Sequence, residues 1–152
     1  MDDLAFGVCA QAERPEGGTV PDWVHLVPAG RIAGRDGRSF VLDRSQDVLD
    51  HFAANGADLP VDYQHQTEAP KPAGPVPAAG WIKELKAAAN GIWGRVEWTG
   101  RARAMIGARE YRYLSPVVLY RKKDGRIVAL KGAGLVHHPN FALVALNAQE
   151  TA

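Results

Sequence analysis

Residues 80–99 read GWIKELKAAANGIWGRVEWT, and this stretch decides the fold class. The dipeptide Asn90-Gly91 is typical of a tight hairpin turn. After it, apolar side chains alternate from Ile92 to Trp98, which is the period of a half-buried strand. The stretch therefore predicts a β-hairpin, and a hairpin of this length needs further strands to bury its apolar face.

Working outward, the sequence supplies those strands. A second hairpin is expected in residues 111–136, turning at Asp124-Gly125. Val and Phe-rich runs bounded by Gly, Pro and Asp predict further short strands in residues 23–30, 38–43 and 58–66. The segment 67–80 carries four of the ten prolines of the chain and is expected to form a flap over the domain.

Two helices are expected between these strands. Residues 43–56, DRSQDVLDHFAANG, have an apolar stripe, a cap at Asp43 or Ser45, and a stop at Asn55-Gly56. Residues 100–111 predict a second, shorter helix. The fold class is thus α+β and β-rich, a partly closed β-barrel with a few flanking helices. We expect a flexible or loosely docked arm in residues 1–20, one domain in residues 21–146 and a polar tail in residues 147–152.

Composition excludes several function classes. The 152 residues are 46% hydrophobic and carry a formal net charge of +1, so no electrostatic footprint points to nucleic acid or a membrane surface. No apolar run reaches the roughly 18–20 residues of a membrane span. The N-terminus begins with two acids and has no basic segment typical of a signal peptide. The single cysteine, Cys9, suits a cytosolic compartment.

Ser115 is the candidate nucleophile. The chain has three serines, of which Ser45 is explained by helix capping and Ser39 by the start of a strand. Ser115 instead interrupts an aromatic and aliphatic strand, EYRYLSPVVLY. Because Pro116 has no backbone N–H, an oxyanion hole cannot use the amide that follows the nucleophile, and its donors must come from elsewhere.

A serine hydroxyl reacts only beside a base, and histidine is the usual base near neutral pH. Of the five histidines, His25 lies in an apolar strand and His51 on a helix, which favours structural roles. His65 lies 50 residues before Ser115, and His137 lies 22 residues after it. Both stand at strand ends or in loops, where functional side chains are commonly displayed. From the residues alone, a buried serine satisfied by the backbone, with surface histidines in loops, is the more ordinary interpretation.

A zinc site formed by His65, His137 and His138 is a further alternative, since three imidazoles suffice for a catalytic metal. The spacing of these residues fits none of the common histidine motifs for zinc. We therefore expect no metal and no organic cofactor.

Several ordered segments resemble the Mu-like phage I protein family. They are DYQHQTE at 62–68, AAGWIKEL at 78–85, GIWGRVEWT at 91–99, EYRYLSPVV at 110–118 and GLVHHPN at 134–140. The resemblance covers about residues 59–140 and implies a protease or scaffolding protein of phage head assembly. Through the related prohead proteases and herpesvirus assemblins it also implies a β-barrel wrapped by helices, with catalytic residues in the order His, Ser, His.

Carried over to this chain, the resemblance makes Ser115 the nucleophile, His65 the general base and His137 the third member. The family stretch that matches LVHHPN more often reads LTNNP, with asparagine where His137 stands. His138 and Asp62 therefore remain alternatives for the third member, whose task is to hold the imidazole tautomer.

The resemblance implies a serine endopeptidase that cleaves phage scaffolding protein, the major capsid protein and itself within an assembling procapsid in the host cytoplasm. A homodimer is a further expectation, whereas nucleic acid and membranes are not expected partners. Family members continue into a charged helical scaffolding region, so the chain is expected to be the protease part alone. The alternative is a non-catalytic capsid-assembly or scaffold-docking module with the same fold.

Overall fold

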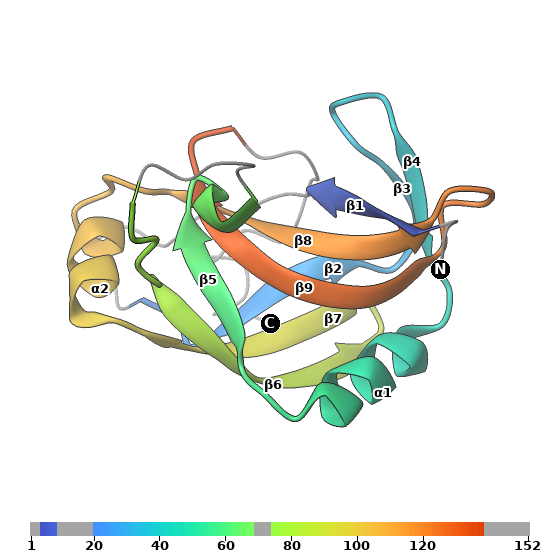
Figure 1. Ribbon diagram of the computed structural model, residues 1–152, viewed down its shortest axis with the longest axis horizontal. Helices are drawn as coiled ribbons and strands as arrows, with labels where there is room; N and C mark the ends of the chain where they lie inside the picture. Colours follow the sequence, from blue (N-terminus) through green and yellow to red (C-terminus); the bar gives the residue numbers. More distant parts are fainter. Residues whose placement is uncertain (1–3, 9–19, 69–73, 139–152) are drawn as a thin grey trace.

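The computed structural model describes residues 4–8, 20–68 and 74–138, with backbone alone considered for residues 4–8 (Figure 1). A seven-stranded sheet forms most of the molecule. In spatial order its strands are β1 (Leu4–Val8), β8 (Tyr113–Arg121), β9 (Ile127–Val136), β5 (Leu59–Tyr63), β6 (Gly80–Ala88), β7 (Gly91–Trp98) and β2 (Trp23–Pro28). Neighbouring strands are antiparallel except for β5 and β9, which run parallel.

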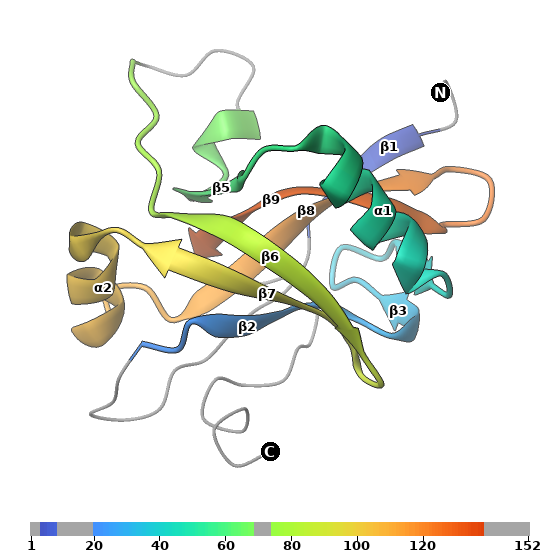
Figure 2. The ribbon, with the colours of Figure 1, turned by 90° about the horizontal axis from the view of Figure 1, so that it is seen from below.

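The sheet curls into a half-barrel, which Figure 2 shows with β6 and β7 passing across β8 and β9. Its apolar faces enclose one core that draws on all the long strands, including Val24, Ile82, Ile92, Val96 and Leu130. The β-rich α+β fold expected from the sequence is thus confirmed. Between β2 and the start of β8 the described strands approach without pairing, so a seam remains in the barrel wall.

Both predicted helices are present, α1 (Ser45–Asn55) and α2 (Gly100–Gly107). The predicted cap of α1 is wrong, because Arg44 occupies the cap position and no side chain caps the helix. Asp43 instead accepts a hydrogen bond from Arg126 at 3.0 Å. The predicted stop is confirmed, with Gly56 in the left-handed conformation at φ 66°.

Both predicted hairpins are present as well. The β6–β7 hairpin turns at Ala89 and Asn90, one residue earlier than expected, and Gly91 begins β7 at φ 127°. The β8–β9 hairpin turns through Asp124, as predicted. A separate two-stranded sheet pairs β3 (Gly30–Ala33) with β4 (Ser39–Leu42).

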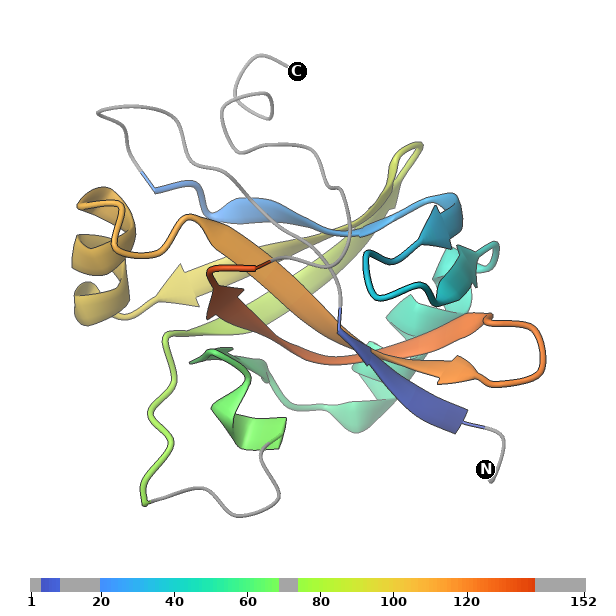
Figure 3. The ribbon, with the colours of Figure 1, turned by 90° about the horizontal axis from the view of Figure 1, so that it is seen from above.

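The N-terminal arm is partly structured. The sequence showed no strand pattern there, yet residues 4–8 form β1 and pair with β8, from Leu4 opposite Arg121 to Val8 opposite Val117 (Figure 3). Residues 9–19 of the expected arm and the expected tail at 147–152 lie outside the described residues. Of the Pro-rich segment, residues 74–79 are described and form neither helix nor strand.

Candidate active site

Three neighbouring strands place Ser115, Gly134 and Asp62 in one row. Ser115 on β8 pairs with Gly134 on β9, and Gly134 pairs with Asp62 on β5. Their chain neighbours Leu114, Leu135 and Val61 belong to the hydrophobic core. Because side chains alternate along a strand, the row faces away from the core. Ser115 and Asp62 thus flank a residue that has no side chain.

His65 fills the space that Gly134 leaves. A Cβ atom added to Gly134 would lie 3.0 Å from Nδ1 and 3.1 Å from Cε1 of His65, and 2.7 Å from Oδ1 of Asp62. The imidazole and the carboxylate therefore meet above the glycine. Side chains on paired residues of neighbouring strands start about 5 Å apart, so the same position is within reach of the Ser115 hydroxyl.

The chain leaves β5 through a strained turn that sets the direction of His65. Gln64 and His65 both have φ 56°, a left-handed conformation that costs a non-glycine residue on the order of 1 kcal/mol or more. After them, residues Gln66–Glu68 form the single turn η1. Such strain persists where surrounding contacts fix the backbone, and it is concentrated at functional sites.

Asp62 supplies those contacts. Its Oδ1 accepts the backbone N–H of His65 at 3.1 Å, and its Oδ2 accepts the N–H and the hydroxyl of Thr67 at 2.9 and 2.6 Å. The carboxylate is buried and holds the turn from inside. These hydrogen bonds explain why an aspartate lies in an otherwise apolar strand: its carboxylate stabilises the turn that follows.

The polar atoms of the candidate pair are buried. Ser115 has no exposed surface, and neither its Oγ nor the two ring nitrogens of His65 have a hydrogen-bond partner among the described residues. Burial lowers the pKa of His65 below its ordinary value, against the opposing influence of Asp62 and Glu68. The imidazole is therefore neutral near pH 7 and able to accept a proton.

One further carboxylate, of Glu68, and one ammonium group, of Lys131, border the turn. Glu68, at the end of η1, accepts a hydrogen bond through Oε2 from Lys131 on β9 at 2.8 Å. Its other oxygen, Oε1, is buried and has no hydrogen-bond partner within the described part of the chain. The turn thus lies over β9, where Figure 1 draws η1 in green.

His137 and His138 lie elsewhere, just past the end of β9, and both are exposed. The His137 ring stacks on Tyr111, with centroids 4.8 Å apart and planes within 5°. Tyr111 in turn contacts Tyr63 at 5.7 Å. The structure therefore brings Ser115, His65 and Asp62 together and places His137 beside an aromatic cluster.

Of the two remaining histidines, His25 has the structural contacts expected of it. His25 is buried, stacks on Trp93 and hydrogen-bonds through Nε2 to the carbonyl of Asn90 at 2.8 Å. His51 lies exposed on α1.

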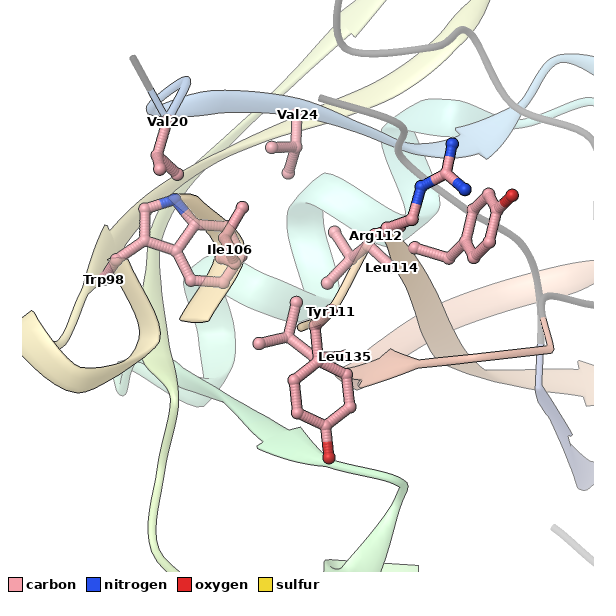
Figure 4. Close-up of a pocket in the computed structure, with 9 residues that line it drawn as sticks. Val20, Val24, Trp98, Ile106, Tyr111, Arg112, Leu114 and Leu135 are labelled. Carbon is pink, nitrogen blue, oxygen red and sulfur yellow. The ribbon is translucent and has the colours of Figure 1, made fainter. Parts of the chain in front are cut away.

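An apolar pocket lies behind the row, at the seam between β2 and β8 (Figure 4). Leu114 and Leu135, which line it, are the chain neighbours of Ser115 and Gly134. Figure 4 shows the Tyr111 side chain at its border, pointing toward β5. The other lining residues are Val20, Val24, Trp98, Ile106, Arg112 and Tyr113.

Other kinds of site find no support in the described part of the chain. Within it, no group of three or more His, Cys, Asp or Glu side chains is arranged to hold a metal ion. Neither of its helices has the length and apolar character needed to cross a membrane.

Sequence reasoning had no role for Gly134, Thr67 or Glu68. The available signal was the Gly-x-Gly pattern at Gly132 and Gly134 inside an apolar strand, which marks a place where other atoms approach the backbone closely.

Comparison with known proteins identifies the family. Residues 24–147 match the family model of the Mu-like prophage I protein, N-terminal domain. The chain belongs to this family. The match includes His65, Ser115, His137 and Asp62, and it confirms the resemblance seen in the sequence.

Two curated relatives of the Mu-like I protein family are similar along most of the chain. Protease I of Escherichia phage Mu is 28% identical over 133 residues, which cover 77% of this chain and 37% of the relative. The Mu-like prophage FluMu I protein of Haemophilus influenzae is 31% identical over 149 residues, which cover 87% of this chain and 40% of the relative. The chain spans about two fifths of the length of these relatives. No solved structure matches the chain, so the expected likeness to assemblins stays a prediction.

Proposed function

We propose that the domain is a serine endopeptidase in which Ser115 is the nucleophile and His65 is the general base. The observation that carries the proposal is the imidazole lying over Gly134, in the row that joins Ser115 to Asp62. The name Protease I of the phage Mu relative supports the same reaction class.

In this reaction His65 accepts the Ser115 proton while Oγ attacks the peptide carbonyl. The imidazolium then protonates the departing amine, and an acyl-enzyme remains on Ser115. Water, deprotonated by His65, releases the acyl group and restores the serine. The reaction requires a hydrogen bond from Ser115 to His65 that forms when substrate binds, since catalytic hydrogen bonds commonly become well aligned only in the substrate complex.

Asp62 is our preferred third member. It already fixes the His65 backbone and approaches the same point above Gly134 as the ring. A buried carboxylate next to an imidazole stabilises its protonated form. His137, the original assignment, remains the second candidate, and His138 follows it in the chain.

Kinetics of three substitutions separate these candidates. Asp62→Asn should lower kcat by about 10²-fold or more, because the imidazole loses its charged neighbour. His137→Ala and His138→Ala should each change kcat less than about threefold, because both rings are exposed and the His137 ring stacks on Tyr111. A large loss in His137→Ala with a small loss in Asp62→Asn would reassign the third member.

Substrates are proposed to be extended segments of phage scaffolding and capsid proteins, cleaved within an assembling procapsid in the host cytoplasm. The edge of β8 supports an extended mode of binding. Among the described residues, β1 pairs with β8 at residues 117–121, and no strand pairs with that edge at residues 113–116. A substrate strand added there would pass directly beside Ser115.

One observation favours the alternative of a non-catalytic docking module, namely the complete burial of Ser115. A cleavage assay distinguishes the two functions. Purified chain is mixed with scaffolding protein of its own phage, and new peptide termini are identified by mass spectrometry. A peptidase loses cleavage by at least about 10³-fold in Ser115→Ala and His65→Ala. A docking module binds the scaffold equally well in all three forms and cleaves it in none.

A further inference from the structure

The segment that carries His65 is fastened to β9 at both ends. At its start, the N–H of Gln64 donates to the carbonyl of Leu135 at 2.9 Å. At its end, Glu68 accepts from Lys131 at 2.8 Å. Gly132 and Gly134 lie between these two β9 attachment points, so the segment runs along a stretch of strand that includes both glycines.

The Glu68–Lys131 ion pair is partly shielded from solvent. The Glu68 side chain is 22% exposed and that of Lys131 46% exposed, so the carboxylate is the more buried partner. Lys131 is also the residue at which the β8–β9 register shifts, between the pairs Val117–Gly132 and Val118–Leu130. The bulge therefore presents the ammonium group to η1.

Only one of the two carboxylate oxygens of Glu68 is engaged by Lys131. Its Oε1 is buried and has no hydrogen-bond partner, and the same holds for both ring nitrogens of His65 three residues earlier. The Asp62 carboxylate, by contrast, already accepts three hydrogen bonds from the turn. The Glu68 carboxylate is near enough to the ring to favour its protonated form, and its Oε1 is engaged by no other described group.

We propose that Glu68, held in place by Lys131, is a positioning residue for His65 that supports the imidazole in its protonated state. This inference rests on the proposed function, in which His65 carries the proton between Ser115 and the leaving group. Asp62 then holds the backbone of the turn and is the first negative charge near the imidazole, and Glu68 is the second. The charged side chains that act on the ring are Asp62 on β5 and Glu68 on η1, and Lys131 on β9 pairs with Glu68. His137 and Arg101 lie against Tyr111 and Tyr63, respectively.

The test compares Glu68→Gln, Lys131→Met and Lys131→Arg with the wild-type chain. The matched control is Lys83→Met, because Lys83 pairs with Asp58 at 2.6 Å in a similar exposed ion pair near the other end of β5. We expect kcat to fall about tenfold in Glu68→Gln and Lys131→Met, with KM within about twofold. Lys131→Arg and Lys83→Met should keep the wild-type kcat.

A direct titration of His65 by NMR provides a readout that does not depend on activity. Removing the Glu68 charge should move the His65 midpoint to lower pH, because the carboxylate favours the protonated ring. The Lys83→Met midpoint should equal that of the wild type. An unchanged His65 titration and unchanged kcat in Glu68→Gln would overturn the inference.

The two proposals fail differently. If Ser115→Ala retains peptidase activity, the proposed function is wrong, whatever Glu68 does. If Ser115→Ala is inactive while Glu68→Gln matches the wild type in kcat and in the titration, only the role of Glu68 is wrong.

Discussion

At the scale of single residues, the candidate site depends on the absence of a side chain at Gly134. The imidazole of His65 and the carboxylate of Asp62 both lie within about 3 Å of the position a Cβ would take. The 2.7 Å contact with Asp62 is too short for a real Cβ atom, and the contacts with His65 at 3.0 and 3.1 Å are tight, so a larger residue must displace the carboxylate and crowds the ring. Glycine thus sets the geometry of the site without taking part in its chemistry.

We predict that Gly134→Ala lowers peptidase activity by about 10²-fold, because a shift of about 1 Å in a catalytic group has an effect of this size. The loss should appear in kcat, measured with a peptide substrate. Gly107→Ala is the control, since its added Cβ meets no atom within 4 Å and α2 should tolerate alanine. Wild-type kcat in Gly134→Ala would show that the ring need not lie above the glycine.

Sequence reasoning reached Ser115 and His65 by chemical type and through the resemblance. In the structure Ser115 lies on β8 and His65 in the turn after β5, and both strands flank β9. It treated Asp62 as one alternative among three and missed Glu68. The reason is physical, since both carboxylates are placed by the turn at Gln64 and His65. These two residues adopt the left-handed conformation although neither is a glycine, so the sequence does not predict the turn.

At the scale of elements, the β6–β7 hairpin joins the edge strand β2 through its turn. The carbonyl of Asn90 accepts both the N–H of Ala29, at 3.1 Å, and the Nε2–H of His25, at 2.8 Å. Gly91 follows at φ 127°, with a Cβ position only 1.9 Å from the carbonyl oxygen of Val27. The space beside this glycine is filled by the backbone of Val27 and Ala29, which cannot move aside as a side chain could.

We predict that Gly91→Ala destabilises the fold by about 3 kcal/mol or more, because both the dihedral angle and the overlap with backbone oppose a side chain. Chemical denaturation measures the change in the free energy of unfolding. Gly100→Ala, where a Cβ meets nothing within 4 Å, should differ from the wild type by less than about 1 kcal/mol. Equal stability of the two variants would contradict the described turn.

Most elements follow from local sequence signals, because period, turn dipeptides and helix stops act within a few residues. The exceptions are long-range. Asp43 could cap α1 but is engaged by Arg126, 83 residues away. Strand β1 has no pattern of its own and is defined by its backbone pairing with β8.

At the scale of the whole molecule, the row of Ser115, Gly134 and Asp62 exists because β9 pairs with β8 on one side and, in parallel, with β5 on the other. Parallel neighbours need a crossover connection, and no local signal states which strands will meet. The barrel class could therefore be predicted, whereas the neighbourhood of Ser115 could not. The same arrangement leaves the β8 edge beside Ser115 without a paired strand among the described residues.

We predict that peptides bind this edge through alternate backbone groups, because an added strand turns every second N–H toward its neighbour. N-methylation at every second position of a peptide inhibitor should weaken inhibition at least tenfold for one set of positions. The other set, which points to solvent, serves as the internal control. Equal tolerance of both sets would contradict strand addition.

The most direct test of the central claim is to find where a fluorophosphonate probe attaches, using mass spectrometry of the wild-type chain and of His65→Ala. The account predicts an adduct on Ser115 in the wild type and its loss in His65→Ala, with circular dichroism unchanged. An adduct on Ser39 or Ser45 with Ser115 unmodified, or equal labelling of Ser115 without His65, would contradict a histidine-activated Ser115.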